Sequence, residues 1–168
     1  MSHGGLIIGV DIGGTKTAVA LATAEGRVIR RHRMPTPARQ GPEVLLEAIC
    51  QAIEQVRGDV GMGQVSGIGV GAPGPYDSRL QVVSSSPHLA AWRNVPLKQL
   101  LEKKLGKPAF VDNDANAAAL GEHRFGAGVG TSHMIYITVS TGIGGGLILG
   151  GKLYVGASGA AGEVGHMT

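Results

Sequence analysis

The stretch Asp11-Ile12-Gly13-Gly14-Thr15-Lys16 decides how the first half of the sequence is interpreted. The apolar run from Leu6 to Val10 precedes it and predicts a buried strand that ends at Asp11. A second strand is predicted over residues 17–23 and, after a turn at 24–27, a third over 28–34. Consecutive strands joined by such short turns predict that the chain opens with an antiparallel meander.

The two glycines of this turn indicate a backbone that a ligand can approach closely. Without a Cβ atom, glycine lets main-chain N–H groups reach an anion such as a phosphate. The Asp11 carboxylate would be costly to bury without a partner, and Mg²⁺ favours one or two carboxylates together with phosphate oxygens. Thr15 and Lys16 add a hydroxyl group and a positive charge. A plain β-hairpin turn is the alternative, and a P-loop is excluded because G-x-x-x-x-G-K-[ST] is absent.

A second glycine-rich turn lies near the other end of the sequence, between Thr138 and Gly146. It is predicted to join strands over 133–140 and 146–149, with another strand over 152–155. Two such turns facing each other across a cleft would hold the phosphates of a nucleotide. The candidate phosphate-binding residues are Asp11, Gly13, Gly14, Thr15, Lys16, Thr141, Gly142 and Gly144.

The residues between the two turns predict alternating strands and helices, hence an α/β fold with a mixed sheet. Apolar residues spaced by three and four predict an amphipathic helix over 42–57. Strands are expected over 65–71 and 109–111, helices over 97–105 and 113–125, and irregular structure over 76–96. The polar, glycine-rich segment 126–132 predicts a boundary between a first unit, 1–125, and a second, 126–168.

Asn113 and Asp114 are the candidates for acid–base chemistry, because a carboxylate beside an amide can deprotonate a hydroxyl group that the amide orients. Asp114 is the better base and Asn113 the better orienting group, although either can simply cap the helix that follows. Glu163 and His166 are isolated polar residues among small ones, and the small neighbours would admit a compact polar ligand.

Composition excludes several classes of function. Apolar residues make up 43% of the 168 residues and charged residues 16%, which argues against disorder. The net charge is +3 and no stretch approaches a run of five or six like charges, so no nucleic-acid partner is expected. Cys50 is the single cysteine, which excludes an internal disulfide, and it is expected to fill the core. No apolar run is long enough to cross a bilayer and the start is unlike a signal peptide, so we expect a cytoplasmic protein without a membrane partner.

Five segments, in this order, resemble the ROK family of bacterial repressors and sugar kinases, and are most similar to its glucokinase-type members. They are Asp11 to Lys16, Gly71-Ala72-Pro73-Gly74-Pro75, Asn113-Asp114-Ala115-Asn116-Ala117, Ser140 to Gly146 and Gly162-Glu163-Val164-Gly165-His166. The resemblance implies an actin-like, ribonuclease-H-like fold of two lobes with ATP and a sugar in the cleft, and here an incomplete second lobe. It also implies ATP-dependent phosphorylation of a hexose, glucose or an N-acetylhexosamine, at the C6 hydroxyl.

The resemblance further implies a role for each candidate residue. Asp114 would be the catalytic base, and the sugar would be held by Gly74, Asn113, Asp114, Glu163 and His166. The two glycine turns would hold the ATP phosphates and magnesium, with Asp11 as the Mg²⁺ residue. His166 would ligate Zn²⁺ only if cysteines followed in a longer chain.

The sequence departs from the family pattern at His88-Leu89-Ala90-Ala91-Trp92, where the family often has Asn-Leu-Pro-Gly-Trp. His88 is interpreted either as a sugar-loop residue or as a surface residue, and Trp92 as a packing residue. A half-lobe would expose apolar surface, so a homodimer is expected. A DNA-binding repressor is disfavoured because few residues precede the first strand. A truncated or non-catalytic protein that binds sugar without turnover stays an alternative.

Overall fold

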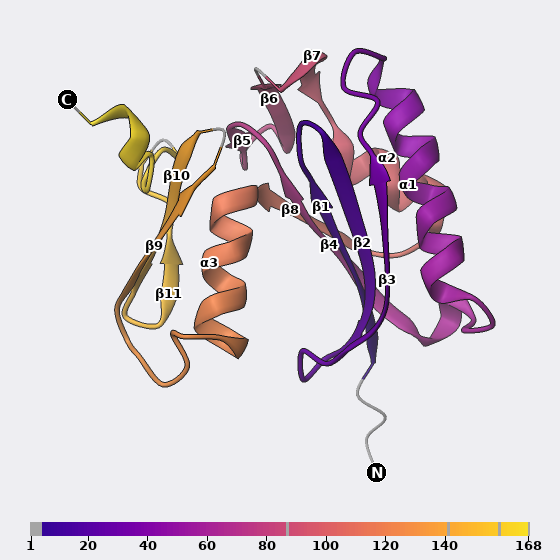
Figure 1. Cartoon of the computed structure of the whole chain (residues 1–168), viewed down its shortest axis with the longest axis horizontal. Helices are drawn as coiled ribbons and strands as arrows, with labels where there is room; N and C mark the ends of the chain where they lie inside the picture. The colour runs from indigo at the N-terminus through magenta and orange to yellow at the C-terminus, as the bar shows by residue number, and fades with distance from the viewer. Residues whose placement is uncertain (1–4, 87, 141, 158, 168) are drawn as a thin grey trace.

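The computed structural model describes residues 5–86, 88–140, 142–157 and 159–167. Its largest sheet has five strands in the order β3-β2-β1-β4-β8 (Figure 1). These strands are β1 (Leu6–Ile12), β2 (Lys16–Thr23), β3 (Val28–Pro35), β4 (Val65–Ala72) and β8 (Ala109–Asn113). The first three pair antiparallel and β4 and β8 run parallel to β1. The predicted meander and the predicted mixed sheet are therefore both confirmed.

Two helices cover one face of this sheet and a third lies on the other (Figure 1). They are α1 (Pro42–Arg57) and α2 (Leu97–Leu105) on the first face, and α3 (Asp114–Phe125) on the second. The core forms where the apolar face of α1 meets the sheet, with Ile8, Leu21, Ile49 and Ile53 fully buried. Helix α1 ends at Gly58, whose φ of 56° suits glycine. Short 3-10 turns follow at Met62–Gln64 and Val164–His166.

Strand β1 corrects the prediction of a fully buried strand ending at Asp11. Its side chains alternate, so that Ile8, Val10 and Ile12 are buried against the helices while Asp11 is exposed on the opposite face. The physical reason is that α1 and α2 cover only one side of the sheet in this region. Asp11 therefore lies on the face of the sheet that α1 and α2 leave uncovered.

Residues 76–96 correct a second prediction, because they form a sheet and not irregular structure. Its strands are β5 (Tyr76–Asp77), β6 (Val82–Ser86) and β7 (Leu89–Val95), in the order β5-β6-β7. Val83, Leu89, Trp92 and Val95 are buried within the main core, and Trp92, at 1% exposure, is the packing residue that the sequence indicated. The short strands and the serine run 84–86 obscured the alternation on which the prediction depended.

A third sheet, in the order β11-β10-β9, lies on the side of α3 that faces away from the five-stranded sheet. Its strands are β9 (Met134–Val139), β10 (Ile143–Leu149) and β11 (Lys152–Tyr154). Strand β10 begins three residues before the predicted start at 146. Helix α3 packs on this sheet as well as on β4, so it joins the two sheets. The division of the chain after residue 125 stays a prediction.

Cys50 is only partly buried, so it is not the fully buried core residue that was expected. Among the residues that the structure describes, no helix is long and apolar enough to cross a membrane.

Candidate active site

The β1–β2 turn is closed by its own main chain and by Thr36. The N–H of Gly13 donates to the carbonyl of Lys16 at 3.0 Å, and a Cβ at Gly13 would lie 2.7 Å from that carbonyl oxygen. The hydroxyl of Thr36 donates to the Gly13 carbonyl at 2.7 Å. Glycine is thus required at position 13 by the closure of the turn itself. Thr15 and Lys16 are exposed beside it.

Asp11 lies on the open face of the sheet, in register with Ala18 of β2, which pairs in turn with Arg33 of β3. Partial burial raises the pKa of Asp11, and the positive charge of Arg33 opposes this effect by lowering it. Among the described residues, no hydrogen bond or ion pair reaches the Asp11 carboxylate. Its oxygens are therefore available to a ligand at the sheet surface.

Asn113 is both the N-cap of α3 and a link to the Gly74 segment. Its Oδ1 accepts from the N–H groups of Ala115 at 2.9 Å and Asn116 at 3.3 Å. Its Nδ2 donates to the carbonyl of Gly74 at 3.1 Å. The structure thus brings together two residues predicted to bind sugar, and it fixes the amide plane of Asn113 from both ends.

Asp112 and Asn116 support Asn113, and sequence reasoning gave neither of them this role. The Oδ1 of Asp112 accepts from the Asn113 N–H at 2.7 Å and from Asn116 Nδ2 at 3.0 Å. Asn116 is 4% exposed, and its Oδ1 has no partner among the described residues. A polar residue on an otherwise alanine-rich helix was the available signal in the sequence.

Asp114, the candidate base, is half-buried at the first position of α3. Burial raises its pKa, and the negative charge of Asp11 raises it further. The N–H of Ala115, which Oδ1 accepts at 2.9 Å, and the charge of His88 lower it. Because the net direction is upward, the carboxylate is a stronger proton acceptor than an ordinary aspartate.

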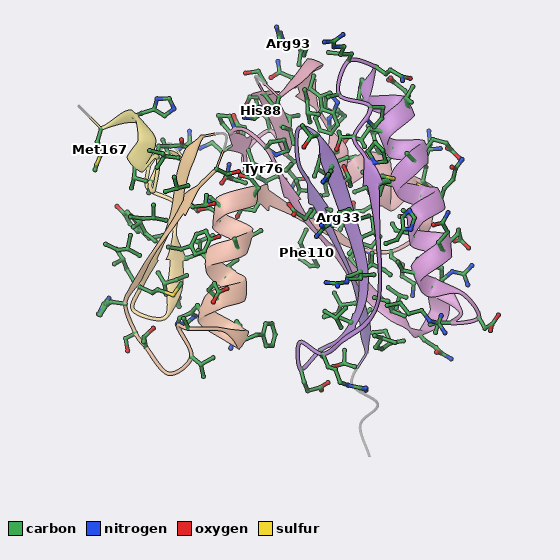
Figure 2. All side chains as sticks on the ribbon, in the orientation of Figure 1. Arg33, Tyr76, His88, Arg93, Phe110 and Met167 are labelled. Carbon is green, nitrogen blue, oxygen red and sulfur yellow. The ribbon has the colours of Figure 1, made fainter. Side chains whose placement is uncertain are left out.

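Two cavities adjoin this cluster. The larger, of about 1420 Å³, is an open cleft between the five-stranded sheet and α3, and both Asp11 and Asp114 line it. Arg33, Tyr76 and Phe110 lie along the same cleft and are labelled in Figure 2. The smaller cavity, of about 660 Å³, is lined by Asn113, Asn116 and Glu163 with glycines and alanines of 156–161.

The predicted site residues thus fall into groups. Asp11 and Asp114 share the larger cleft, whereas Asn113 and Glu163 share the smaller cavity beside Gly74. Neither cavity is lined by the remaining predicted residues, which are Gly13, Gly14, Thr15, Lys16, Gly142, Gly144 and His166.

The second glycine turn contributes mainly to packing. A Cβ at Gly146 would lie 2.6 Å from the Cβ of Ala119, and one at Gly144 would lie 3.4 Å from the Cβ of Ala115. These glycines let β10 lie directly on α3. Gly142 is exposed, and its carbonyl accepts from the N–H of Ser140 at 2.8 Å. Thr141 lies outside the described residues, and phosphate binding by this turn stays a prediction.

Glu163 and His166 are both exposed, and the His166 N–H donates to the Glu163 carbonyl at 3.1 Å. Within the described part of the chain, no three His, Cys, Asp or Glu residues gather as a metal site would require. Zinc binding by His166 with cysteines of a longer chain stays a prediction.

Replacing Asn113 by Ala is expected to destabilise the fold by about 1 kcal/mol, because α3 loses its N-cap. Urea denaturation followed by circular dichroism measures this change. Asn113→Asp is the matched control, since a carboxylate still accepts from the Ala115 and Asn116 N–H groups but cannot donate to Gly74. Equal losses of stability in the two variants would contradict the capping role.

Asp114→Asn is expected to stabilise the protein at neutral pH. A pKa raised on folding means that the ionised carboxylate is disfavoured in the folded state, so this stability cost is present above the folded pKa. It disappears below the unfolded value of about 3.9, where both states are protonated. Thermal melts from pH 3 to 7 should therefore show a Tm gain over wild type that grows with pH. Asp59→Asn, an exposed control, should show no such growth, and a constant difference for Asp114→Asn would contradict the account.

Comparison with known proteins agrees with this geometry. A family model described as the ROK family matches residues 7–168. The chain is 45% identical over 163 residues to a glucokinase of Streptomyces coelicolor, covering 97% of this chain and 50% of that protein. It is also 37% identical over 166 residues to a xylose repressor of Caldicellulosiruptor bescii, covering 98% of this chain and 41% of the repressor.

The fold has a close match among solved structures. A ROK family glucokinase from Streptomyces griseus, crystallised with glucose and AMPPNP, superposes with a TM-score of 0.87 at 44% identity. The match covers 97% of this chain and 50% of that one. The predicted actin-like α/β fold is therefore confirmed. The chain spans about half the length of the curated relatives that it matches.

Proposed function

Because the chain belongs to the ROK family, we propose that it serves the ATP-dependent phosphorylation of a hexose. The substrate is glucose or an N-acetylhexosamine, and the acceptor is its C6 hydroxyl. The observation that carries this proposal is that Asp11 and Asp114 line one cleft, where burial and, after it, the negative charge of Asp11 raise the pKa of Asp114. Kinase chemistry needs such a base beside a place for phosphates.

The reaction follows from what Asp114 and Asn113 can do. The sugar hydroxyl oxygen attacks the γ-phosphorus, the bond from that phosphorus to the oxygen bridging to the β-phosphate breaks, and ADP leaves. The hydroxyl proton passes to the Asp114 carboxylate, whose raised pKa favours its acceptance. Asn113, fixed between the α3 N–H groups and Gly74, orients the hydroxyl group.

Asp11 fits a role toward Mg²⁺, because its carboxylate is exposed and makes no other bond among the described residues. When bound, Mg²⁺ supplies charge neutralisation at the phosphates. Lys16 and the N–H groups of the β1–β2 turn would hold phosphate oxygens, and Glu163 would accept hydrogen bonds from sugar hydroxyls. The S. griseus relative was crystallised with AMPPNP, which supports ATP as the donor.

A coupled assay tests the proposal, with ADP release followed for glucose, N-acetylglucosamine and N-acetylmannosamine. We expect turnover with one of these sugars and none without sugar. The xylose repressor relative favours a second candidate function, sugar binding without turnover. Calorimetry that detects hexose binding, in a protein that releases no ADP, would select this second function and reject the first.

A further inference from the structure

We propose that His88 is a further residue of the phosphoryl-transfer site, where its imidazole N–H donates a hydrogen bond to the phosphate held by the β1–β2 turn. The inference rests on the proposed function, since it names a new ligand for the same phosphates. It is supported by a contact with the turn, an anchored main chain and an electrostatic effect on Asp114.

The contact with the turn lies at Gly14. A Cβ built on Gly14 would lie 2.8 Å from the Cβ of His88, 3.2 Å from its Cγ and 3.4 Å from its Nδ1. The His88 side chain therefore lies directly against the turn, and the missing Cβ at Gly14 is what admits it. Figure 2 shows His88 beside the upper end of the β1–β2 hairpin.

The main chain at His88 is anchored on both sides. Its N–H donates to the hydroxyl of Ser86 at 3.2 Å, and Ser86 is 3% exposed. Leu89, the next residue, is completely buried. His88 itself is exposed, so an anchored main chain presents the imidazole to solvent beside the turn.

The third observation is electrostatic. The negative charge of Asp11 raises the pKa of Asp114 and the positive charge of His88 lowers it, so His88 acts electrostatically on the candidate base. Phosphoryl transfer at this site would bring together the negative charges of Asp11, Asp114 and the γ-phosphate. A histidine offers an N–H donor that can carry positive charge, and such a charge-assisted hydrogen bond to phosphate is stronger than one from a neutral amide.

Binding of magnesium tripolyphosphate to the 168-residue chain tests the inference, measured by calorimetry and by the ¹⁵N resonances of the His88 ring. His88→Ala is expected to weaken binding about ten-fold, as the loss of one charge-assisted hydrogen bond implies. His88→Asn should fall between His88→Ala and wild type, because it keeps a neutral donor. The ¹⁵N chemical shifts of the His88 ring should change during the titration. They should reach their plateau at the same tripolyphosphate concentration as the calorimetric heat.

Two further variants separate the possible failures. His133→Asn, in the β9–β11 region, should bind tripolyphosphate as wild type does, and Lys16→Gln should weaken binding through loss of charge at the turn. If Lys16→Gln weakens binding but His88→Ala does not, the role of His88 is rejected, while phosphate binding by the β1–β2 turn is retained. The hydrogen bond is also rejected if His88→Ala binds tripolyphosphate more weakly but the ¹⁵N resonances of the His88 ring in wild type do not shift on binding. No uptake by wild type would reject the proposed function and this inference together.

Discussion

Asp114→Asn is expected to lower the rate of hexose phosphorylation by about 10²–10⁴-fold, the usual contribution of a positioned general base. The amide matches the carboxylate in shape but cannot accept the hydroxyl proton. Hexose affinity should change by no more than a few fold, because Asn113 and Glu163 keep their positions and their hydrogen-bonding groups. The coupled assay gives kcat, and calorimetry gives the hexose affinity.

Asp59→Asn is the control for this experiment, because Asp59 is an exposed carboxylate in the loop after α1. It should leave both quantities unchanged. Undiminished turnover in Asp114→Asn would remove Asp114 from the role of base. A parallel loss of turnover and hexose affinity would instead assign Asp114 to sugar binding alone.

Trp92→Ala is expected to cost about 3–5 kcal/mol of the free energy of unfolding, since a fully buried indole leaves a large cavity. For a protein of this size, that corresponds to a fall in Tm of roughly 10 °C. The loss should be large because Trp92 joins the β5–β7 sheet to the core under α1 and α2. Chemical denaturation gives the free energy directly.

Leu80→Ala is the matched control within the same segment, because Leu80 is 67% exposed. It should change stability by less than about 0.5 kcal/mol. If Trp92→Ala changed the free energy of unfolding as little as Leu80→Ala, the β5–β7 sheet would not be packed on the core. The position of His88, which follows from that packing, would then lose its support.

Much of the fold could be predicted from local patterns. The meander, α1 and α2 follow from periodicity and from glycine and proline signals, and these act within a few residues. The β5–β7 sheet was missed because its alternation becomes visible only when Val83, Leu89 and Trp92 meet side chains of the distant α1 and α2. The open face of β1 was missed for the same reason, since a strand alone does not show which face is covered.

The candidate site was predictable in its residue types but less so in its geometry. Asp11 and Asp114 do share a cleft, and Asn113 does reach Gly74. The sequence predicts that the glycines let an anion approach, and this stays a prediction for both turns. In the structure Gly14 admits His88, while Gly146 admits Ala119 of α3. A missing Cβ identifies a close approach, but only the fold shows which group approaches.

We propose that one chain presents both a phosphate turn and a hexose-orienting amide around Asp114. Calorimetric titration of the 168-residue chain with glucose and then with magnesium AMPPNP tests it most directly. We expect saturable heat for each ligand, with the glucose heat greatly reduced in Asn113→Ala and the nucleotide heat reduced in Lys16→Gln. Absence of saturable heat for both ligands, from a chain whose circular dichroism shows that it is folded, would contradict the claim.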